Sequence, residues 1–318
     1  MSGRVILITG GTSGIGFETA RHLAEGGHDI VITCRDREKG DEACARIQAK
    51  WPNALIEFME LDLSSMQSVK EFVKIFTKKK RRLHVLINNA GMAPNFKDLS
   101  RRCTSEGLEY VMATNHLGHF LLTNMVLDYL KTAGEITGDA RIVNVTCGLH
   151  DHENGGLLMR GIGFLDPENF TLKKEGSYNG LQAYKNSKLC NVLFTFKLAE
   201  KLHNTYVRVN TVDPGVIPTT HLKRNASKLS QSMSCCCMNY TPKWSSKVRT
   251  AKQAGAHIAD LAVSERFDGV SGKYFRDGHE ERAGTEAYDT DLQSEVWKLS
   301  KKLTKFRTDS EFEEVSLN

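Results

Sequence analysis

The sequence has no run of 18 or more apolar residues, so no segment is expected to cross a membrane as a helix. Residues 1–4 lead directly into a predicted strand, which leaves no room for a signal peptide. The eight cysteines include no CxxC pair, the spacing typical of zinc ligands, so free thiols and no metal site are expected. These absences predict a protein that folds in the cytoplasm and is not secreted.

The sequence also lacks a strong excess of charge of one sign. Its formal net charge is +5 over 318 residues, whereas nucleic-acid binders usually carry a much more basic surface, so no nucleic-acid partner is expected. The basic run at residues 78–82 is interpreted as the exposed end of a helix, with a localisation signal or a patch for anionic surfaces as alternatives. Acylation of Cys235, Cys236 and Cys237 would give peripheral membrane contact; chance clustering on a loop is the other interpretation.

The chain has no repeat and no interdomain linker. Six or seven strand patterns alternate with helical patterns, which predicts an α/β fold with a single doubly wound parallel sheet (Rossmann-type) and helices on both faces. We expect one domain over residues 1–305 and a disordered tail over 306–318. Residues 216–247 have a weak pattern and are expected to form a lid over the substrate. The long connection before residue 180 is expected to border the substrate pocket.

A glycine-rich turn joins the first predicted strand, residues 4–9, to a helix. The turn contains Gly10, Ser13, Gly14, Ile15 and Gly16. Glycines let the backbone approach a pyrophosphate, and the free N–H groups of a helix start bind it. The alternative is a tight turn that needs glycine only for its dihedral angles.

The second predicted strand ends at Arg35, 19 positions after Gly16. In a dinucleotide-binding fold, an acidic residue about 20 positions on would bind the ribose 2′-hydroxyl. A guanidinium instead suits a 2′-phosphate through its charge and fork geometry, so NADP(H) is predicted as the preferred cofactor. NAD(H) stays an alternative, because Asp36 would place a carboxylate at the ribose after a small shift in register. Arg35 would otherwise be only a surface charge.

Tyr184 and Lys188 lie four positions apart on a predicted helix and therefore share one face. A lysine ammonium near the phenol lowers the tyrosine pKa from about 10, which makes the tyrosine a proton donor and acceptor near neutral pH. This spacing also occurs by chance on solvated helices. Here it follows the glycine-rich turn and the segment 88–91 in a fixed order, which favours a functional interpretation.

Two further polar residues are candidates for the site. Asp62, after the third predicted strand, could accept a hydrogen bond from an adenine amine or cap the helix that begins near Ser65. Asn115 lies within a long helical pattern, where asparagine is unfavourable. It is interpreted as distorting the helix and holding a water, or as a buried contact between helices. His116 and His119 are interpreted as packing residues.

Taken together, these residues resemble the short-chain dehydrogenase/reductase family over nearly the whole chain. The matching motifs are Thr9-Gly10-x-x-x-Gly14-Ile15-Gly16, Asp62-Leu63, Asn88-Asn89-Ala90-Gly91, Asn115, Tyr184-x-x-x-Lys188 and Pro214-Gly215-Val216. Residues 115–120, 187–194 and 272–275 are similar to the branch that contains the retinol dehydrogenases and the WW-domain-containing oxidoreductase.

The resemblance implies roles for these residues. Tyr184 would be the acid/base, Lys188 would lower its pKa and bind the nicotinamide ribose, and Asn115 would hold a proton-relay water. The cofactor would be bound by Gly10, Ser13, Gly14, Ile15, Gly16, Arg35, Asp62, Leu63, Asn89, Ala90, Gly91, Tyr184, Lys188, Pro214, Gly215, Val216 and Thr219.

One catalytic position departs from the family. The family has Ser-Ser at the end of the fifth strand, and the second serine binds the substrate oxygen; here the pair is Thr146-Cys147. A thiol is a weaker donor than a hydroxyl, and losing one such donor costs on the order of 10²–10³ in rate by analogy with oxyanion donors. Neighbours in a strand point to opposite faces, so Thr146 replaces the serine only if the strand end twists.

Two functions follow from the resemblance. The first is an oxidoreductase that transfers a hydride between NADP(H) and a hydrophobic alcohol or carbonyl, either retinoid, steroid or lipid-like. The second is a catalytically impaired NADP(H)-binding protein that acts as a partner or scaffold, favoured by Cys147. Paired long helices form homodimers in many members of the family, so a homodimer is also considered.

Overall fold

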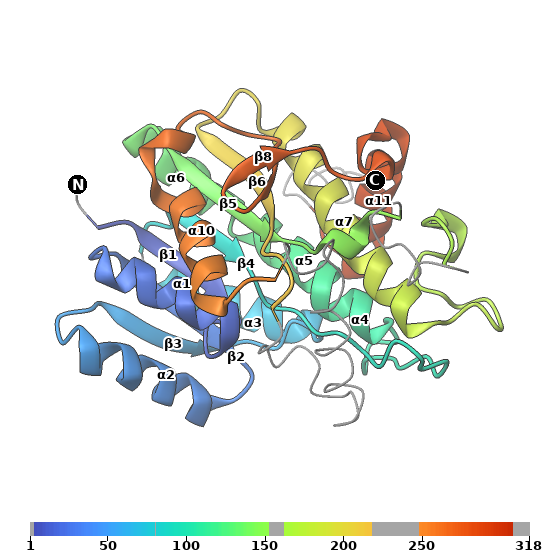
Figure 1. Cartoon of the computed structure of the whole chain (residues 1–318), viewed down its shortest axis with the longest axis horizontal. Coiled ribbons are helices and arrows are strands. Elements are labelled where there is room, and N and C mark those ends of the chain that lie inside the picture. Colours follow the sequence, from blue (N-terminus) through green and yellow to red (C-terminus); the bar gives the residue numbers. More distant parts are fainter. Residues whose placement is uncertain (1–2, 80, 153–161, 218–247, 308–318) are drawn as a thin grey trace, which may run out of the picture.

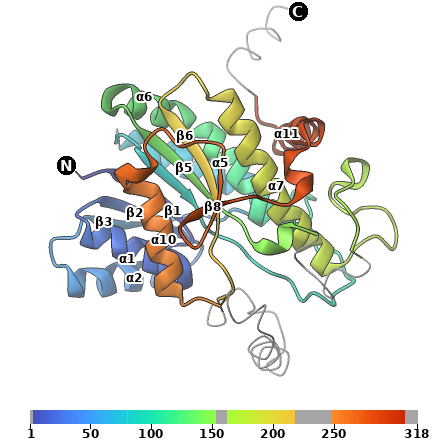
Figure 2. The same cartoon turned by 45° about the horizontal axis from the view of Figure 1, so that its top comes forward.

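The computed structural model describes residues 3–79, 81–152, 162–217 and 248–307. These residues form one eight-stranded sheet in the order β3-β2-β1-β4-β5-β6-β7-β8, with helices on both faces (Figures 1 and 2). All neighbouring strands are parallel except β7 and β8, which are antiparallel. The predicted Rossmann-type α/β fold is confirmed.

The strands are β1 (Val5–Thr9), β2 (Asp29–Cys34), β3 (Ile56–Glu60), β4 (Val85–Asn88), β5 (Ala140–Val145), β6 (Val207–Asp213), β7 (Tyr274–Arg276) and β8 (His279–Glu281). The helices are α1 (Gly14–Glu25), α2 (Arg37–Lys50), α3 (Met66–Lys78), α4 (Tyr110–Met112), the π-helix η1 (Ala113–Leu117), α5 (Gly118–Met125), α6 (Leu127–Thr137), α7 (Gly180–Lys201), α10 (Ala251–Val263) and α11 (Thr290–Thr304).

The central strands separate two hydrophobic cores. In β1, Ile6 and Ile8 pack on the side of α1, α2 and α10, whereas Leu7 packs on the side of α3, α5 and α7. All three side chains are completely buried, as expected for a strand covered by helices on both faces. Successive residues of β1 face different cores, so every one of these positions is apolar. This continuous apolar run made the strand readable from the sequence.

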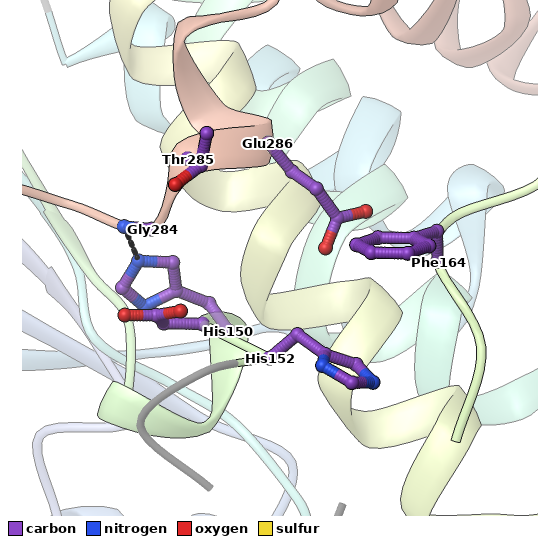
Figure 3. A pocket seen from close by; sticks show the side chains of 7 residues that line it. His150, His152, Phe164, Gly284, Thr285 and Glu286 are labelled. Carbon is purple, nitrogen blue, oxygen red and sulfur yellow. Dashed lines mark hydrogen bonds between the residues drawn. The ribbon is translucent and has the colours of Figure 1, made fainter. Parts of the chain in front are cut away.

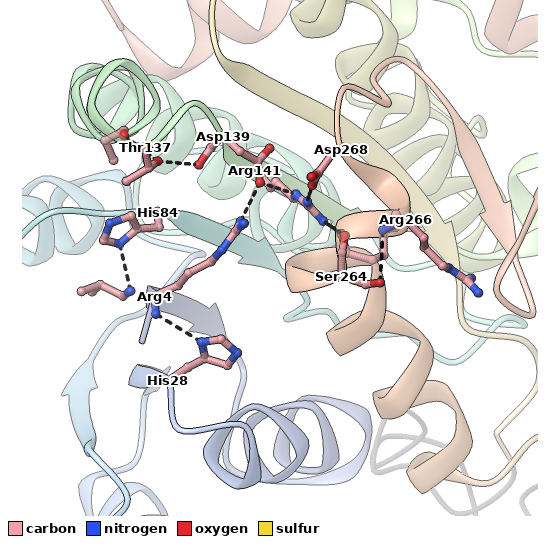
Figure 4. Close-up of polar contacts among 12 residues, drawn as sticks. Arg4, His28, His84, Thr137, Asp139, Arg141, Ser264, Arg266 and Asp268 are labelled. Atoms are coloured by element: carbon pink, nitrogen blue, oxygen red, sulfur yellow. Dashed lines mark hydrogen bonds and ion pairs between the residues drawn. The ribbon is translucent and has the colours of Figure 1, made fainter. Parts of the chain in front are cut away.

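An ion-pair cluster holds the amino edge of the sheet together (Figure 4). The guanidinium of Arg141 in β5 is buried and donates to Asp139 Oδ2 (2.8 Å), to Asp268 Oδ1 (2.5 Å) and to the carbonyl of Ser264 (2.8 Å). Asp139 Oδ2 also accepts from Arg4 Nη1 at 2.7 Å. A buried charge is tolerated only when it is paired in this way, so these residues join β1, β5 and the end of α10.

The structure differs from the sequence patterns in two places. The long helical pattern around Asn115 is divided into α4, η1 and α5, and α6 begins after a break at Val126. The sequence patterns also named neither β8 nor α11. Trp297 of α11 packs on Phe120 (ring centroids 5.1 Å apart) and Phe194 (5.8 Å), so α11 lies against α5 and α7.

Two sequence expectations can be placed only in part. Most of the expected lid, including Thr219 and Cys235 to Cys237, lies outside the described residues, as does most of the expected tail. In the part of the chain that the structure describes, no helix combines the length and the apolar content needed to cross a bilayer.

Candidate active site

The glycine-rich turn between β1 and α1 has the backbone geometry that an anion site requires. Gly10 and Gly14 have φ values of +68° and +56°, which residues other than glycine rarely adopt. A Cβ on Gly16 would lie 2.3 Å from the carbonyl oxygen of Gly10. Within the described residues, the side chain of the N-cap Ser13 makes no capping hydrogen bond. The first N–H groups of α1 are therefore suited to a pyrophosphate, so the residues present fit a dinucleotide.

Thr9 fastens this turn to the end of β4. Its Oγ1 accepts hydrogen bonds from the backbone N–H groups of Asn89 (2.9 Å) and Ala90 (3.0 Å). The side-chain amide of Asn89 donates to the carbonyls of Thr9 (2.8 Å) and Gly10 (3.2 Å). The predicted cofactor residues of the two strands thus form one hydrogen-bonded unit at the carboxyl edge of the sheet.

His119 links this unit to Asn115. Its Nε2 lies 2.8 Å from Thr9 Oγ1, and its Nδ1 lies 3.0 Å from the carbonyl oxygen of Asn115. Thr9 Oγ1 already accepts two N–H groups, so we assign its hydroxyl as the donor to His119 Nε2. The ring N–H is then at Nδ1 and donates to the carbonyl of Asn115. Burial lowers the pKa of His119 to about 3 and keeps the ring neutral. The packing role expected for His119 therefore includes a specific polar link.

Arg35 and Asp36, which follow β2, have different partners and different exposure. Arg35 is exposed and donates from Nη1 to the hydroxyl of Tyr110 at 2.8 Å. Asp36 is the N-cap of α2, where its Oδ1 accepts from the N–H of Lys39 at 3.2 Å and its carboxylate pairs with the Lys39 ammonium. These bonds to Lys39 lower the pKa of Asp36. The Asp36 carboxylate therefore caps α2, whereas the Arg35 guanidinium is exposed at the surface.

Asp62 does not cap α3. Its Oδ1 accepts from the N–H (2.9 Å) and the hydroxyl (2.7 Å) of Ser64, and Ser65 is the N-cap. The capping alternative for Asp62 is therefore wrong. The next residue, Leu63, is buried against the start of α5, where a Cβ on Gly118 would lie 2.2 Å from the carbonyl oxygen of Leu63.

The predicted distortion of the helix at Asn115 is a π-helix turn, η1, which widens the helix by one residue per turn. The Asn115 side chain binds the backbone of Met92 twice: Oδ1 accepts from N–H (2.8 Å) and Nδ2 donates to the carbonyl (2.9 Å). Nδ2 also donates to Ser187 Oγ at 3.0 Å. Asn115 thus joins α7 to the segment that follows β4.

Two of the predicted catalytic side chains, Lys188 and Asn115, lie beside Gly91, and Lys188 is also close to Tyr184. Tyr184 and Lys188 are both buried on one face of α7, with Lys188 Nζ 5.9 Å from the centre of the Tyr184 ring. Lys188 Nζ donates to the carbonyl of Val145 at 3.3 Å. A Cβ on Gly91 would lie 3.3 Å from Lys188 Nζ and 3.4 Å from Asn115 Oδ1. Glycine therefore keeps a close approach to these two polar groups open.

Cys147, and not Thr146, faces the tyrosine. Cys147 packs in the same cluster as Tyr184, and its thiol is close enough to contribute to the raised pKa of the tyrosine. Thr146 is buried on the other side, and its Oγ1 donates to the carbonyl of Lys188 at 2.8 Å. The strand end keeps its alternation, so the Thr146 hydroxyl does not take the serine position.

The pKa of Tyr184 is shifted in the opposite direction to the one predicted from the sequence. Burial, followed by the adjacent Cys147, raises the pKa of Tyr184 well above its usual value of 10.0. Burial also lowers the pKa of Lys188, while Cys147 and Asp213 oppose that effect. The predicted lowering of the tyrosine pKa by Lys188 is wrong for the described structure, because desolvation of the phenolate dominates.

Asp213 is a site residue that the sequence patterns missed. It ends β6, is buried, and its Oδ1 accepts from the N–H of Gly215 at 3.0 Å. Its Oδ2 accepts from Arg276 Nε at 3.0 Å. The carboxylate thereby shapes the turn through Pro214 and Gly215, whose φ is +80°, up to Val216. Only the pairing of β6 with β7 brings Arg276 to this position.

A small cavity lies between the segment after β5 and the C-terminal segment (Figure 3). It is lined by His150, Asp151, His152, Phe164, Gly284, Thr285 and Glu286. None of the predicted site residues lines it, so this cavity is separate from the catalytic group. Nearby, the buried ammonium of Lys185 pairs with Glu286 at 2.8 Å, which ties the first turns of α7 to this segment.

Comparisons with known proteins agree with this geometry. The family model for short chain dehydrogenase matches residues 4–155. Human retinol dehydrogenase 12 is 35% identical over 309 residues, covering 96% of this chain and 88% of the relative. Human polyprenol dehydrogenase is 34% identical over 306 residues, covering 95% and 85%.

Among solved structures, a putative uncharacterized protein from Mycobacterium paratuberculosis superposes with a TM-score of 0.69 at 26% identity, covering 96% of this chain and 95% of that chain. The chain belongs to the short-chain dehydrogenase family and resembles its retinol dehydrogenase branch. It is an NAD(P)-dependent short-chain dehydrogenase.

Proposed function

We propose that this protein reduces the carbonyl group of a hydrophobic, lipid-like substrate to an alcohol, with NADPH as the preferred cofactor. The observation that carries the proposal is that Lys188 lies close to both Tyr184 and Gly91, with Asn115 also beside Gly91. NADPH, when bound, supplies the hydride. The remaining chemistry belongs to side chains of this chain.

The proposed catalytic roles are proton donation and polarisation. Tyr184 donates its hydroxyl proton to the substrate oxygen as negative charge develops there. Burial raises the pKa of Tyr184 above its usual value of 10, so the phenol keeps its proton at neutral pH and can act as the proton donor. Lys188 supplies positive charge behind the tyrosine, and Asn115 holds the relay water. The Cys147 thiol takes the serine position as a weaker donor.

The cofactor roles follow the same edge of the sheet. Arg35 pairs with the 2′-phosphate through its exposed guanidinium, and this contact would give the preference for NADPH over NADH. The pyrophosphate is assigned to the start of α1. The residues assigned to the cofactor are Gly10, Ser13, Gly14, Ile15, Gly16, Arg35, Asp62, Leu63, Asn89, Ala90, Gly91, Tyr184, Lys188, Pro214, Gly215, Val216 and Thr219.

The proposed substrate class rests on the names of the relatives and on the apolar surroundings of Tyr184. The relatives are named for retinol and polyprenol, both lipid-like alcohols. Met92, Phe96 and Leu149 are half-buried and pack in the same cluster as Tyr184. The domain limits of 1–305, cytoplasmic localisation, membrane contact and a homodimer stay predictions from the sequence.

A second candidate function is an NADP(H)-binding protein with little or no turnover that acts as a partner for another protein. The observation that favours it is the pair at the end of β5, where the Thr146 hydroxyl is committed to the carbonyl of Lys188 and only a thiol faces Tyr184. The intact arrangement of Tyr184, Lys188 and Asn115 favours the enzyme.

The test is fluorescence titration of the purified protein with NADPH and NADH, followed by turnover on a panel of hydrophobic carbonyls. Tight NADPH binding, weak NADH binding and measurable reduction support the enzyme. Binding without turnover, together with a steep gain of turnover in Cys147→Ser, supports the second candidate. If neither nucleotide binds, both proposals are wrong.

A further inference from the structure

The segment from Met92 to Asp98 is held at both ends by elements that carry catalytic residues. At its start, the amide of Asn115 binds both the N–H and the carbonyl of Met92, at 2.8 and 2.9 Å. At its end, the N–H of Gly180 at the start of α7 donates to the carbonyl of Asp98 at 2.9 Å. This segment therefore has a defined position relative to Tyr184.

Gly180 allows the segment to lie directly on α7. A Cβ at Gly180 would be 2.3 Å from the carbonyl oxygen of Asn95 and 3.3 Å from Pro94 Cγ. Such a contact cannot be relieved without moving backbone, so the close approach depends on glycine at the first residue of the helix. Four residues further along the same helix is Tyr184, which faces the same segment.

The side chain that meets the tyrosine is Phe96. The two ring centroids are 5.5 Å apart at an interplanar angle of 43°, a tilted aromatic pair. Phe96 is half-buried, whereas Leu99, three residues on, is 71% exposed. Phe96 is thus the aromatic residue of this segment that is turned toward the catalytic tyrosine, and part of its surface stays accessible.

Phe96 is continuous with a wider apolar surface. Leu149 packs in the cluster of Tyr184 and also, with Phe96, against the buried Ile162 and Leu181. Leu149 is held in place by its neighbour His150, whose Nδ1 lies 2.9 Å from the carbonyl oxygen of Cys147 and whose Nε2 accepts from the N–H of Gly284 at 3.0 Å (Figure 3). We call Met92, Phe96, Leu149, Ile162 and Leu181 the apolar wall.

We propose that Phe96 is a specificity-determining residue that contacts the apolar chain of the substrate next to the reacting carbonyl, so that the enzyme selects aldehydes and ketones with an extended hydrocarbon chain. This inference rests on the proposed function. The apolar wall removes hydrocarbon surface from water, so each further methylene buried against it stabilises the bound substrate. Little conformational entropy of the protein is lost when Phe96 binds substrate, because both ends of its segment are already held by hydrogen bonds.

The test is the dependence of kcat/KM on chain length for a series of unbranched aldehydes from three to ten carbons, with saturating NADPH. In the unmodified protein, kcat/KM is expected to rise with chain length. Phe96→Ala is expected to lower kcat/KM for the ten-carbon aldehyde about tenfold while changing that for the three-carbon aldehyde less than about twofold. Leu99→Ala, an exposed change in the same segment, is the matched control and should leave the series unchanged.

Phe96→Leu guards against misfolding, because it keeps an apolar side chain and is expected to retain most of the chain-length dependence. A uniform loss across the series in Phe96→Ala, or no loss at all, would overturn the inference while the proposed function stands. If the unmodified protein reduces no aldehyde of the series, the proposed function and this inference are both wrong. NADPH titration of each variant shows whether the cofactor site is retained.

Discussion

Arg249 and Asp277 form a two-bond ion pair, in which Nε and Nη2 of the arginine each lie 2.7 Å from one carboxylate oxygen. One residue earlier, Arg276 binds Asp213. Adjacent residues at the turn between β7 and β8 thus hold the chain at Asp213 and at Arg249, which flank residues 214–248. Val216 and Val248 form a parallel bridge between the same two segments. The turn therefore positions the backbone at Pro214, Gly215 and Val216, which we assign to the cofactor site.

Asp277→Asn is expected to weaken NADPH binding about three- to tenfold, because a partly exposed ion pair is worth about 1 kcal/mol and its loss frees the segment at Val216. The measurement is the dissociation constant from fluorescence titration. Asp260→Asn is the matched control, since it removes an exposed ion pair with Arg266 at 3.2 Å. An unchanged constant in Asp277→Asn would mean that this ion pair does not position the cofactor site.

Arg35→Ala is expected to weaken NADPH binding about 10- to 100-fold and to leave NADH binding nearly unchanged, because a charge-assisted contact to the 2′-phosphate contributes about 1.5–3 kcal/mol. The difference should shrink as the salt concentration rises. Arg37→Ala is the control, since Arg37 is also exposed but lies over the ring of Phe58 at 5.9 Å. Equal losses for both nucleotides would show that Arg35 does not read the 2′-phosphate.

Cys147→Ser is expected to raise kcat about 10- to 100-fold, because a hydroxyl donates a stronger hydrogen bond to the developing oxyanion than a thiol does. Thr146→Val should change kcat little but lower the free energy of unfolding by about 1–2 kcal/mol, since it leaves the buried carbonyl of Lys188 without the threonine donor. Single-turnover rates and urea unfolding measure the two effects. An unchanged kcat in Cys147→Ser would show that the strength of this donor does not limit the reaction.

The stability of the fold is expected to fall as the pH falls below about 6.5, the usual pKa of histidine. Burial lowers the pKa of His116 to about 4 and that of His119 to about 3. Between pH 6.5 and pH 4 the unfolded chain therefore binds more protons than the folded chain, so the free energy of unfolding decreases with decreasing pH.

His116→Gln tests this pH dependence. In the folded chain, His116 contacts Asn191 Oδ1 (3.2 Å) and Ser300 Oγ (2.7 Å), and its complete burial disfavours the charged ring. The variant should lose roughly 3 kcal/mol of the change in unfolding free energy between pH 6.5 and pH 4. His203→Gln, at an exposed position, is the control. Parallel pH curves for the variant and the unmodified protein would contradict the prediction.

The fold class and the main motifs were readable from local sequence patterns. The second strand was predicted to end at Arg35 and ends at Cys34 in the structure, and Tyr184 and Lys188 share the predicted helix face. Strands between two helical layers need continuous apolar runs, and helices need periodic ones, so both leave a local pattern. The glycine-rich turn was also readable, because its positive φ values restrict which residue types fit at Gly10 and Gly14.

Tertiary structure alone decided how these motifs act together. Whether Thr146 or Cys147 faces Tyr184 depends on the alternation at one strand end, and the raised pKa of Tyr184 depends on burial by residues distant in sequence. Arg276 reaches Asp213 only through the pairing of β6 and β7, and Phe96 reaches Tyr184 only because Gly180 allows close packing. Such contacts join residues far apart in the chain, so no local periodicity encodes them; desolvation and packing in three dimensions decide them.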